Sequence, residues 1–214
     1  MKGKKNDKRF FKTDIYVYFC NEKLLLYQYY QQMEYIKTAI EGVYIIEPKV
    51  FPDARGYFFE SFKQEEFERN IGPVNFVQDN ESCSSKGVLR GLHFQKGDAS
   101  QAKLVRVVKG TVVDVAVDLR ASSPTFGKYV MAELSGENKR QFFIPRGFAH
   151  GFLVLSDEAV FTYKVDNVYC PQAEGCLRYD DPEVAVAWPE MDQPFLTSEK
   201  DLKGLWLKDT YRFE

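Results

Sequence analysis

The sequence predicts an all-β protein, a sandwich or barrel built from short strands. From about residue 76 to residue 165, short runs rich in Val, Leu, Phe and Tyr alternate with turns. Patterns of helical period are scarce between these runs, which argues against a sheet that alternates with helices. The aromatic content of 15% suits strands, and it also suits the binding of flat ligands by stacking.

Composition indicates an ordinary soluble domain. The chain has 214 residues, of which 44% are hydrophobic and 28% charged, so it is long enough to bury a full core. The formal net charge of −2 gives no sign of general nucleic-acid binding. The four cysteines lack the C-x-x-C spacing of zinc or redox sites, and we expect free thiols in a reducing cytoplasm.

Residues 1–32 differ in character from the rest of the chain. The first dozen residues are rich in Lys and Arg, and two apolar patches follow that Asn21, Glu22 and Lys23 separate. Neither patch reaches the roughly twenty apolar residues of a membrane span, and the interruption is unlike a secretory leader. We expect an N-terminal extension outside the fold, and one domain at residues 33–214. Contact of the basic start with a membrane surface is the alternative.

The remaining elements are expected in chain order. The first ones are a strand at residues 36–48 with a turn at Glu41-Gly42, a loop at 51–56, a strand at 57–62, a short surface helix at 63–70 and a brief strand at 76–80 that ends in Gln78-Asp79-Asn80. The central strands are predicted at residues 103–108, 111–119, 129–134, 141–144, 151–155 and 159–165. A last helix is predicted at residues 198–207, after a stretch of loop.

The strand at residues 111–119 has the clearest periodicity. Its alternate apolar residues Val113, Val115, Val117 and Leu119 share one face of the strand. Asp114 and Asp118 lie on the other face.

His93, one of only two histidines, is the main candidate for catalysis. It lies in the stretch 87–95 among glycines, where a strand can bend or let a ligand approach the backbone. Arg90, Gln95, Gln101 and Lys103 all lie within a few residues of it. Alternate strand residues share a face, so Lys103 in the next strand can face the same polar cavity. We interpret His93 as a general base beside an anion that Arg90 helps to hold. The alternative is a structural histidine.

His150 lies in a second notable segment. The spacing Pro145-x-Gly147-x-x-His150 resembles the second motif of the cupin superfamily, in which metal-binding members use this histidine as a ligand. A three-histidine metal centre cannot be built from a chain with two histidines, so we expect a cupin barrel with no metal and no other cofactor. His150 is then either a hydrogen-bonding barrel residue or a substrate contact.

Six segments, taken together and in order, resemble the dTDP-4-dehydrorhamnose 3,5-epimerase family of nucleotide-sugar enzymes. They are residues 51–60, 77–82, 87–95, 101–106, 143–152 and 179–182. The resemblance runs from about Met33 to about Trp206. It implies a jelly-roll cupin barrel with a few short peripheral helices, a homodimer, and no nucleic-acid or membrane partner.

The resemblance also implies an activity and its residues. The reaction inverts C3 and C5 of dTDP-4-dehydro-6-deoxy-D-glucose to give dTDP-4-dehydro-L-rhamnose, a step of dTDP-L-rhamnose biosynthesis. His93 matches the base, Tyr163 the acid, Asp201 of the segment 198–201 the residue that orients the base, and Lys103 a cation near the enolate. Tyr169 matches an aromatic residue that stacks on thymine. The remaining nucleotide-sugar contacts match Arg55, Glu60, Gln78, Asp79, Asn80, Arg90, His150, Glu174 and Lys200.

The chemistry accounts for these residue types. Hydrogens at C3 and C5 lie next to the C4 ketone, so a base can remove them as protons, and inversion requires their return from the opposite side. An imidazole suits removal near neutral pH, and a phenol suits donation. A cation stabilises the enolate, and Arg55 and Arg90 can bind the pyrophosphate by bidentate contacts.

Three alternatives stay open at this stage. The first is a monofunctional nucleotide-sugar epimerase or a 3,4-ketoisomerase on the same barrel. The second is a metal-dependent cupin oxygenase, against which the histidine count argues. The third is a sugar-binding barrel without catalysis.

Overall fold

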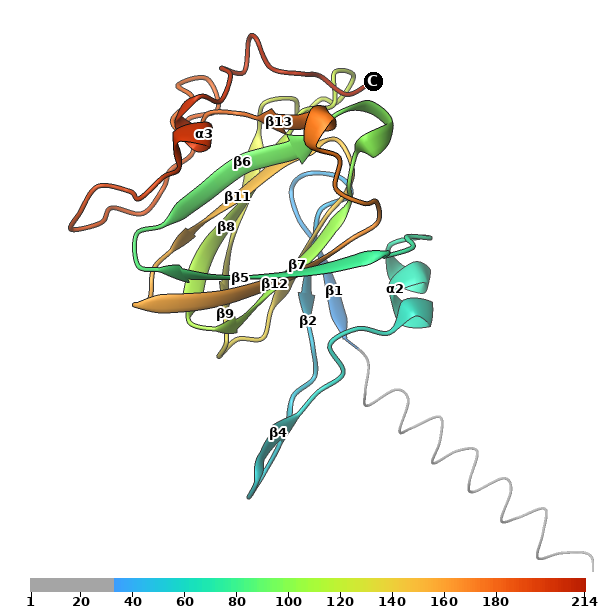
Figure 1. Cartoon of the computed structure of the whole chain (residues 1–214). Coiled ribbons are helices and arrows are strands. Elements are labelled where there is room, and N and C mark those ends of the chain that lie inside the picture. The colour runs from blue at the N-terminus through green and yellow to red at the C-terminus, as the bar shows by residue number, and fades with distance from the viewer. Residues whose placement is uncertain (1–32) are drawn as a thin grey trace, which may run out of the picture.

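The computed structural model describes residues 33–214, and the extension predicted for residues 1–32 lies outside this part of the chain. Two antiparallel sheets face each other (Figure 1). One sheet has the order β1 (Glu34–Lys37), β2 (Tyr44–Glu47), β10 (Gln141–Ile144), β7 (Lys103–Lys109), β12 (Glu158–Val165) and β5 (Gln78–Ser85). The other has the order β13 (Glu174–Cys176), β6 (Leu89–Gln95), β11 (Phe148–Val154), β8 (Thr111–Asp118) and β9 (Tyr129–Ser135). The fold is therefore a β-sandwich of the jelly-roll, cupin-like class, as the sequence predicts.

The main core fills the space between the two sheets. Val105 and Phe161 from the six-stranded sheet pack with Val112, Ala116 and Phe152 from the five-stranded sheet. These residues alternate with outward-facing ones along their strands, which is the pattern that places every second side chain in the interior.

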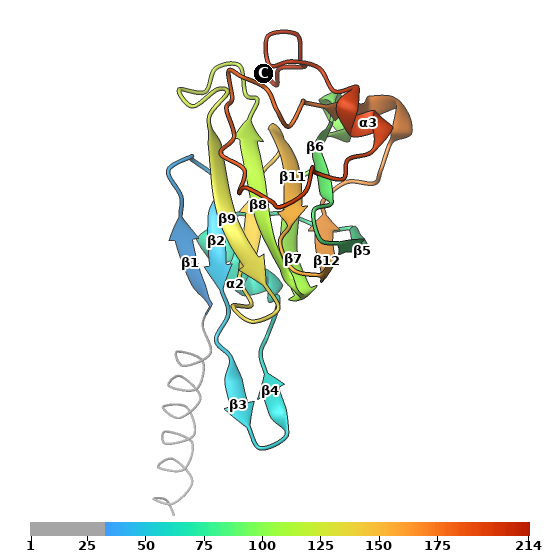
Figure 2. The same ribbon diagram turned by 90° about the vertical axis from the view of Figure 1, so that its left-hand side faces the viewer.

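The outer face of the five-stranded sheet is covered as well. The C-terminal segment crosses it (Figure 2), and Val184, Leu207 and Phe213 pack there against Val113 and Val115 of β8. The predicted alternation in β8 is confirmed. Because both faces of β8 are buried, Asp114 and Asp118 point into the protein and have no exposed side-chain surface.

Helix α2 (Gln64–Asn70) lies where the sequence predicts it. Phe67 from this helix packs against Phe143, with ring centroids 5.1 Å apart. In residues 33–214 no helix has the length and apolar character needed to cross a bilayer. Short 3₁₀ turns occur at Gly97–Ala99 and Pro171–Ala173.

Several predicted boundaries were wrong; the strand predicted at residues 57–62, for example, ends at Phe58. The loop predicted at 51–56 is the hairpin of β3 (Phe51–Asp53) and β4 (Gly56–Phe58), which extends away from both sheets (Figure 2). Residues 78–80 begin a long strand, since β5 pairs with β12 along its whole length. Helix α3 is only Glu199–Leu202, because the backbone N–H of Leu205 donates to the Cys176 carbonyl and so continues the sheet edge.

Candidate active site

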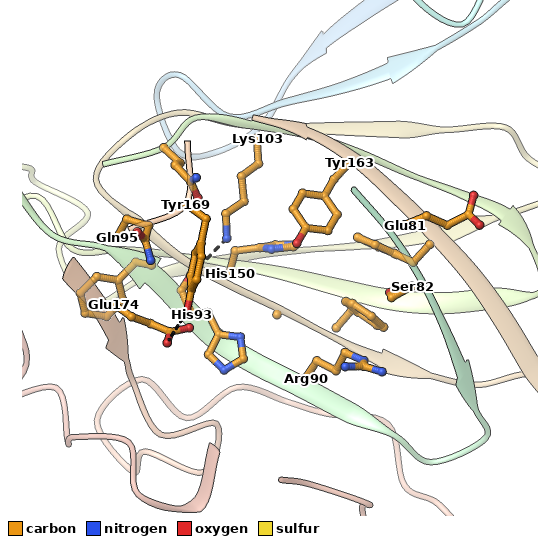
Figure 3. Close-up of a pocket in the computed structure, with 15 residues that line it drawn as sticks. Glu81, Ser82, Arg90, His93, Gln95, Lys103, His150, Tyr163, Tyr169 and Glu174 are labelled. Carbon is orange, nitrogen blue, oxygen red and sulfur yellow. Dashed lines mark hydrogen bonds between the residues drawn. The ribbon is translucent and has the colours of Figure 1, made fainter. Parts of the chain in front are cut away.

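A cavity of about 220 Å³ opens between the two sheets, next to Phe152 and Phe161 of the main core. The five-stranded sheet supplies one wall with Arg90, His93 and His150, and the six-stranded sheet supplies the opposite wall with Lys103 and Tyr163. Figure 3 shows His93 and Tyr163 projecting into the cavity from different sides. A flat ligand between the sheets would therefore meet the imidazole on one face and the phenol on the other.

A β-bulge brings Arg90 and His93 to the same wall. His150 pairs with His93 and Phe152 pairs with Arg90, so β6 has two residues where β11 has one. Residues three apart in a regular strand would face opposite sides of the sheet. Gly91 permits the bulge, because its φ is +133° and a Cβ there would lie 2.6 Å from the Cα of Gly151.

His93 is held from outside the cavity by Asp201. The Nε2 of His93 lies 2.6 Å from the Oδ1 of Asp201, and the other carboxylate oxygen accepts hydrogen bonds from the backbone and side chain of Ser198. Burial raises the pKa of Asp201, but the hydrogen bonds from His93 and Ser198 outweigh it, and the net pKa is lowered. Asp201 is therefore ionised, accepts the Nε2 proton of His93, and leaves Nδ1 as the basic nitrogen.

The second histidine has its own carboxylate partner. The Nε2 of His150 lies 2.9 Å from the Oδ1 of Asp114, and both residues are buried. Burial lowers the pKa of His150, and Lys103 and His93 act in the same direction against the pull of Asp114. His150 is consequently a neutral imidazole that can hydrogen-bond to a ligand.

Lys103 and Tyr163 have pKa values displaced by their surroundings. Burial lowers the pKa of Lys103 to about 8, while Asp114 and Glu174 act to raise it. The Nζ of Lys103 donates to the backbone carbonyl of His93 at 3.4 Å, so the ammonium group of Lys103 lies close to His93. Burial raises the pKa of Tyr163, and Arg90 opposes the shift, so the phenol keeps its proton at neutral pH.

Hydrogen bonds and an ion pair connect the polar side chains at the rim of the cavity. Tyr169, which is half exposed, donates from its hydroxyl to Glu174 at 3.1 Å, and Lys200 forms an ion pair with the same carboxylate. Gln95 accepts a hydrogen bond from the backbone N–H of Cys170 and thereby holds the segment that carries Tyr169. The exposed aromatic ring at this rim is available for stacking.

Several residues predicted to bind substrate lie apart from this cavity within one chain. The side chain of Arg55 is 90% exposed on the β3–β4 hairpin and pairs with Asp53. Asp79 pairs with Lys164 on the other side of the six-stranded sheet, and Asn80 accepts from Gln78. Among the described residues, the cavity lining does not include Arg55, Glu60, Gln78, Asp79, Asn80 or Lys200.

The sequence reasoning missed Asp114 and Ser82. Asp114 holds His150, and its only signal in the sequence is an acidic residue inside a run of valines. Ser82 lines the cavity from β5, beyond the end of the strand predicted at residues 76–80. Cys176, a free thiol like Cys83 and Cys170, lies beside His93; burial raises its pKa to about 12, and Asp201 adds to the shift.

Fold and cavity together define a class: a cupin-type jelly roll whose interior carries an imidazole and a phenol, two groups suited to acid–base chemistry, on facing sheets. The sequence model of the dTDP-4-dehydrorhamnose 3,5-epimerase family matches residues 37–209. The dTDP-4-dehydrorhamnose 3,5-epimerase of Salmonella typhimurium is 56% identical over 165 residues, which cover 77% of this chain and 90% of that protein. The chain belongs to the dTDP-4-dehydrorhamnose 3,5-epimerase family.

Solved structures agree with this assignment. The dTDP-6-deoxy-D-glucose-3,5-epimerase of Legionella pneumophila, in complex with dTDP-4-keto-L-rhamnose, matches with a TM-score of 0.82 and 48% identity over 86% of this chain and 100% of that one. A 3′-monoepimerase from Streptomyces bikiniensis, in complex with dTDP-quinovose, matches with a TM-score of 0.75 and 34% identity over 81% of this chain and 87% of that one. The same fold thus carries enzymes that invert one carbon or two.

Proposed function

We propose that this chain converts dTDP-4-dehydro-6-deoxy-D-glucose to dTDP-4-dehydro-L-rhamnose by inverting C3 and C5. The observation that carries the proposal is the placement of His93 and Tyr163 on facing walls of one cavity. Inversion of a carbon requires exactly such an opposed pair, since the proton leaves from one side of the ring and returns from the other. The family assignment and the ligand bound to the Legionella pneumophila enzyme support the substrate.

The first step is proton removal. The Nδ1 of His93 takes the proton from C5 or C3, the electrons of the C–H bond form the enolate, and negative charge develops on the C4 oxygen. Asp201 stabilises the imidazolium that results, because its carboxylate accepts the Nε2 proton at 2.6 Å. The ammonium group of Lys103 stabilises the enolate oxygen.

The second step is proton return. The hydroxyl of Tyr163 gives its proton to the opposite face of the enolate carbon, and the phenolate then regains a proton from solvent. His93 releases the proton that it took, and the same two groups serve the second carbon after the ring shifts. Arg90, whose Nε donates to Ser84 at 3.0 Å, offers its remaining N–H groups to the diphosphate. Tyr169 stacks on thymine, and Glu174 and Lys200 contact the nucleoside.

The remaining predicted contacts require a second copy of the chain. Arg55 and Glu60 lie on or beside a hairpin that leaves Tyr57 and Phe58 58% and 62% exposed. An exposed aromatic hairpin of this kind is suited to burial against another subunit. We infer a homodimer in which this hairpin reaches the partner's cavity and completes it. The free thiols and the nucleotide-linked substrate favour the cytoplasm as the place of action.

The test is proton NMR of the 4-keto substrate with the enzyme in heavy water. We expect solvent deuterium at both C3 and C5 of the product, together with inversion of both centres. Deuterium at one carbon would instead make this a single-centre epimerase, and migration of the ketone would make it a ketoisomerase. If the protein binds the nucleotide sugar but no sugar hydrogen exchanges with deuterium, it is a sugar-binding barrel without catalysis.

A further inference from the structure

Three potential metal ligands from three separate elements meet behind the catalytic histidine. His93 in β6 and Cys176 in β13 are direct cross-strand partners, so their side chains leave the same face of the sheet. Asp201 from α3 completes the group, and one ligand atom from each residue lies within 4.8 Å of the others. The Nε2 of His93, not the nitrogen that faces the substrate, is the ring atom beside Asp201.

The chemistry of this group matches a soft divalent cation. Imidazole nitrogen, thiolate and carboxylate are all ligands of Zn²⁺, which holds them at roughly 2.0–2.3 Å in a tetrahedron. The atoms therefore have to close to roughly 3.5 Å from one another, which rotation of the Cys176 and His93 side chains can supply. One thiolate and one carboxylate balance the charge of the ion. Water would serve as the fourth ligand of the tetrahedron.

We propose that His93, Cys176 and Asp201 form an inhibitory Zn²⁺ site. The inhibition, though not the binding, rests on His93 being the base of the proposed reaction. Zn²⁺ takes the lone pair of Nε2, and the one proton of the neutral ring then sits on Nδ1. In that tautomer Nδ1 has no lone pair for the substrate proton, so catalysis stops. The thiol proton of Cys176 goes to solvent as the sulfur–metal bond forms.

The site lies on the Asp201 side of His93, outside the cavity that Tyr163 and Lys103 line. It is therefore distinct from a cupin metal centre, which would occupy the barrel interior. Cys176 takes no part in the proposed proton transfers, so its replacement separates metal binding from catalysis.

The experiment compares the full-length wild-type protein with Cys176→Ser, and uses Cys83→Ser, which replaces an exposed thiol on β5 outside this group, as the matched control. After treatment with a chelator, all three should have the same epimerase rate. On titration with ZnCl₂ the wild type and Cys83→Ser should lose activity, and Cys176→Ser should need roughly tenfold more Zn²⁺ or higher for the same loss. Equal sensitivity of Cys176→Ser and wild type would overturn the proposal.

Binding is measured separately from turnover with Co²⁺ as the probe. The wild type should show a near-ultraviolet thiolate-to-cobalt absorption with one ion per chain, and Cys176→Ser should lack it. Absence of this band from the wild type overturns the site whatever the variant does. If the chelated wild type has no epimerase activity but shows the band, the proposed function fails and the metal site stands.

Discussion

Asp201 Oδ1 lies 2.6 Å from the Nε2 of His93, and its second oxygen is fixed by Ser198 at the start of α3. The helix is a single turn, and its capping box is the device that aims the carboxylate. A short helix in the C-terminal segment thereby sets the tautomer of a histidine on β6. The proposed base therefore depends on a residue that does not line the cavity.

Asp201→Asn should lower kcat by roughly 10²- to 10⁴-fold with little change in KM. An amide can donate to Nε2 instead of accepting from it, so the ring would carry its proton on Nδ1, and the imidazolium would lose its counter-charge. Steady-state kinetics measures the effect, with the exposed Asp209→Asn as control. A loss of less than about threefold would mean that Asp201 does not orient the base.

Tyr163→Phe should uncouple exchange from inversion. The ring keeps its packing beside Phe161, with centroids 6.1 Å apart, but it has no proton to give. His93 can still remove a proton and return a deuteron from its own side in heavy water. We expect NMR to show exchange into recovered substrate while formation of the inverted product falls by roughly 10²-fold or more. Loss of exchange together with inversion would contradict this division of roles.

Activity should decline as the pH rises above about 8, where Lys103 loses its charge. The protonated form stabilises the enolate, so the alkaline limb of kcat/KM reports this group. Glu174 acts to raise the pKa of Lys103, and Glu174→Gln should therefore move the limb to lower pH. A pH–rate profile of both proteins checks the shift. If the alkaline decline of kcat/KM stays at the same pH in Glu174→Gln, a group other than Lys103 causes it.

Most of the strands follow from the sequence, and so does the choice of His93 and Tyr163 as candidates, but the shape of the site does not. Alternation in β8 predicts which residues share a face, yet it cannot show that the C-terminal segment buries the second face and leaves Asp114 inside. The spacing of Arg90 and His93 would put them on opposite faces of a regular strand, and only the bulge at Gly91 unites them. Such features depend on tertiary packing, which local pattern does not encode.

The β3–β4 hairpin and the surroundings of Cys176 also could not be predicted from the sequence. Residues 51–56 have turn-forming composition, so a two-stranded hairpin outside the main sheets gives no periodic signal. Cys176 has no ligand-like spacing to any other residue, because its neighbours come from β6 and α3. By contrast, the resemblance of ordered segments identified His93, Lys103 and Tyr163, which the structure gathers around one cavity.

Mixed dimers test whether the hairpin serves the partner's cavity. His93→Ala and Arg55→Ala should each have little activity alone. In a mixed dimer that shares hairpins, one cavity carries both defects and the other carries none, so activity should reappear on mixing and subunit exchange. Rate measurements on co-refolded proteins, with each variant alone as control, show this. If the hairpin serves its own cavity, mixing gives no gain.

The carboxylate of Asp118 should make stability depend on acid pH. This buried side chain accepts from Arg120 at 2.7 and 2.9 Å, Ser123 at 2.6 Å and Thr125 at 2.7 Å. Burial raises the pKa of Asp118, but these hydrogen bonds outweigh burial, and the folded-state pKa lies below the unfolded one. The stabilisation is therefore complete above the unfolded value of about 3.9 and is lost as the pH falls through the folded pKa.

Asp118→Asn should accordingly lower the free energy of unfolding by about 1.5–3 kcal/mol at pH 7, since it removes hydrogen bonds to a buried charge. The difference from wild type should shrink as the pH falls below about 4, where the Asp118 carboxyl of the unfolded wild-type chain begins to take up a proton. Urea unfolding at pH 7 and pH 3 measures both values. Asp53→Asn, which removes an exposed pair with Arg55, is the control and should change neither. A difference that stays constant across this range would mean that the shape of the Asp118 side chain, and not its charge, stabilises the loop after β8.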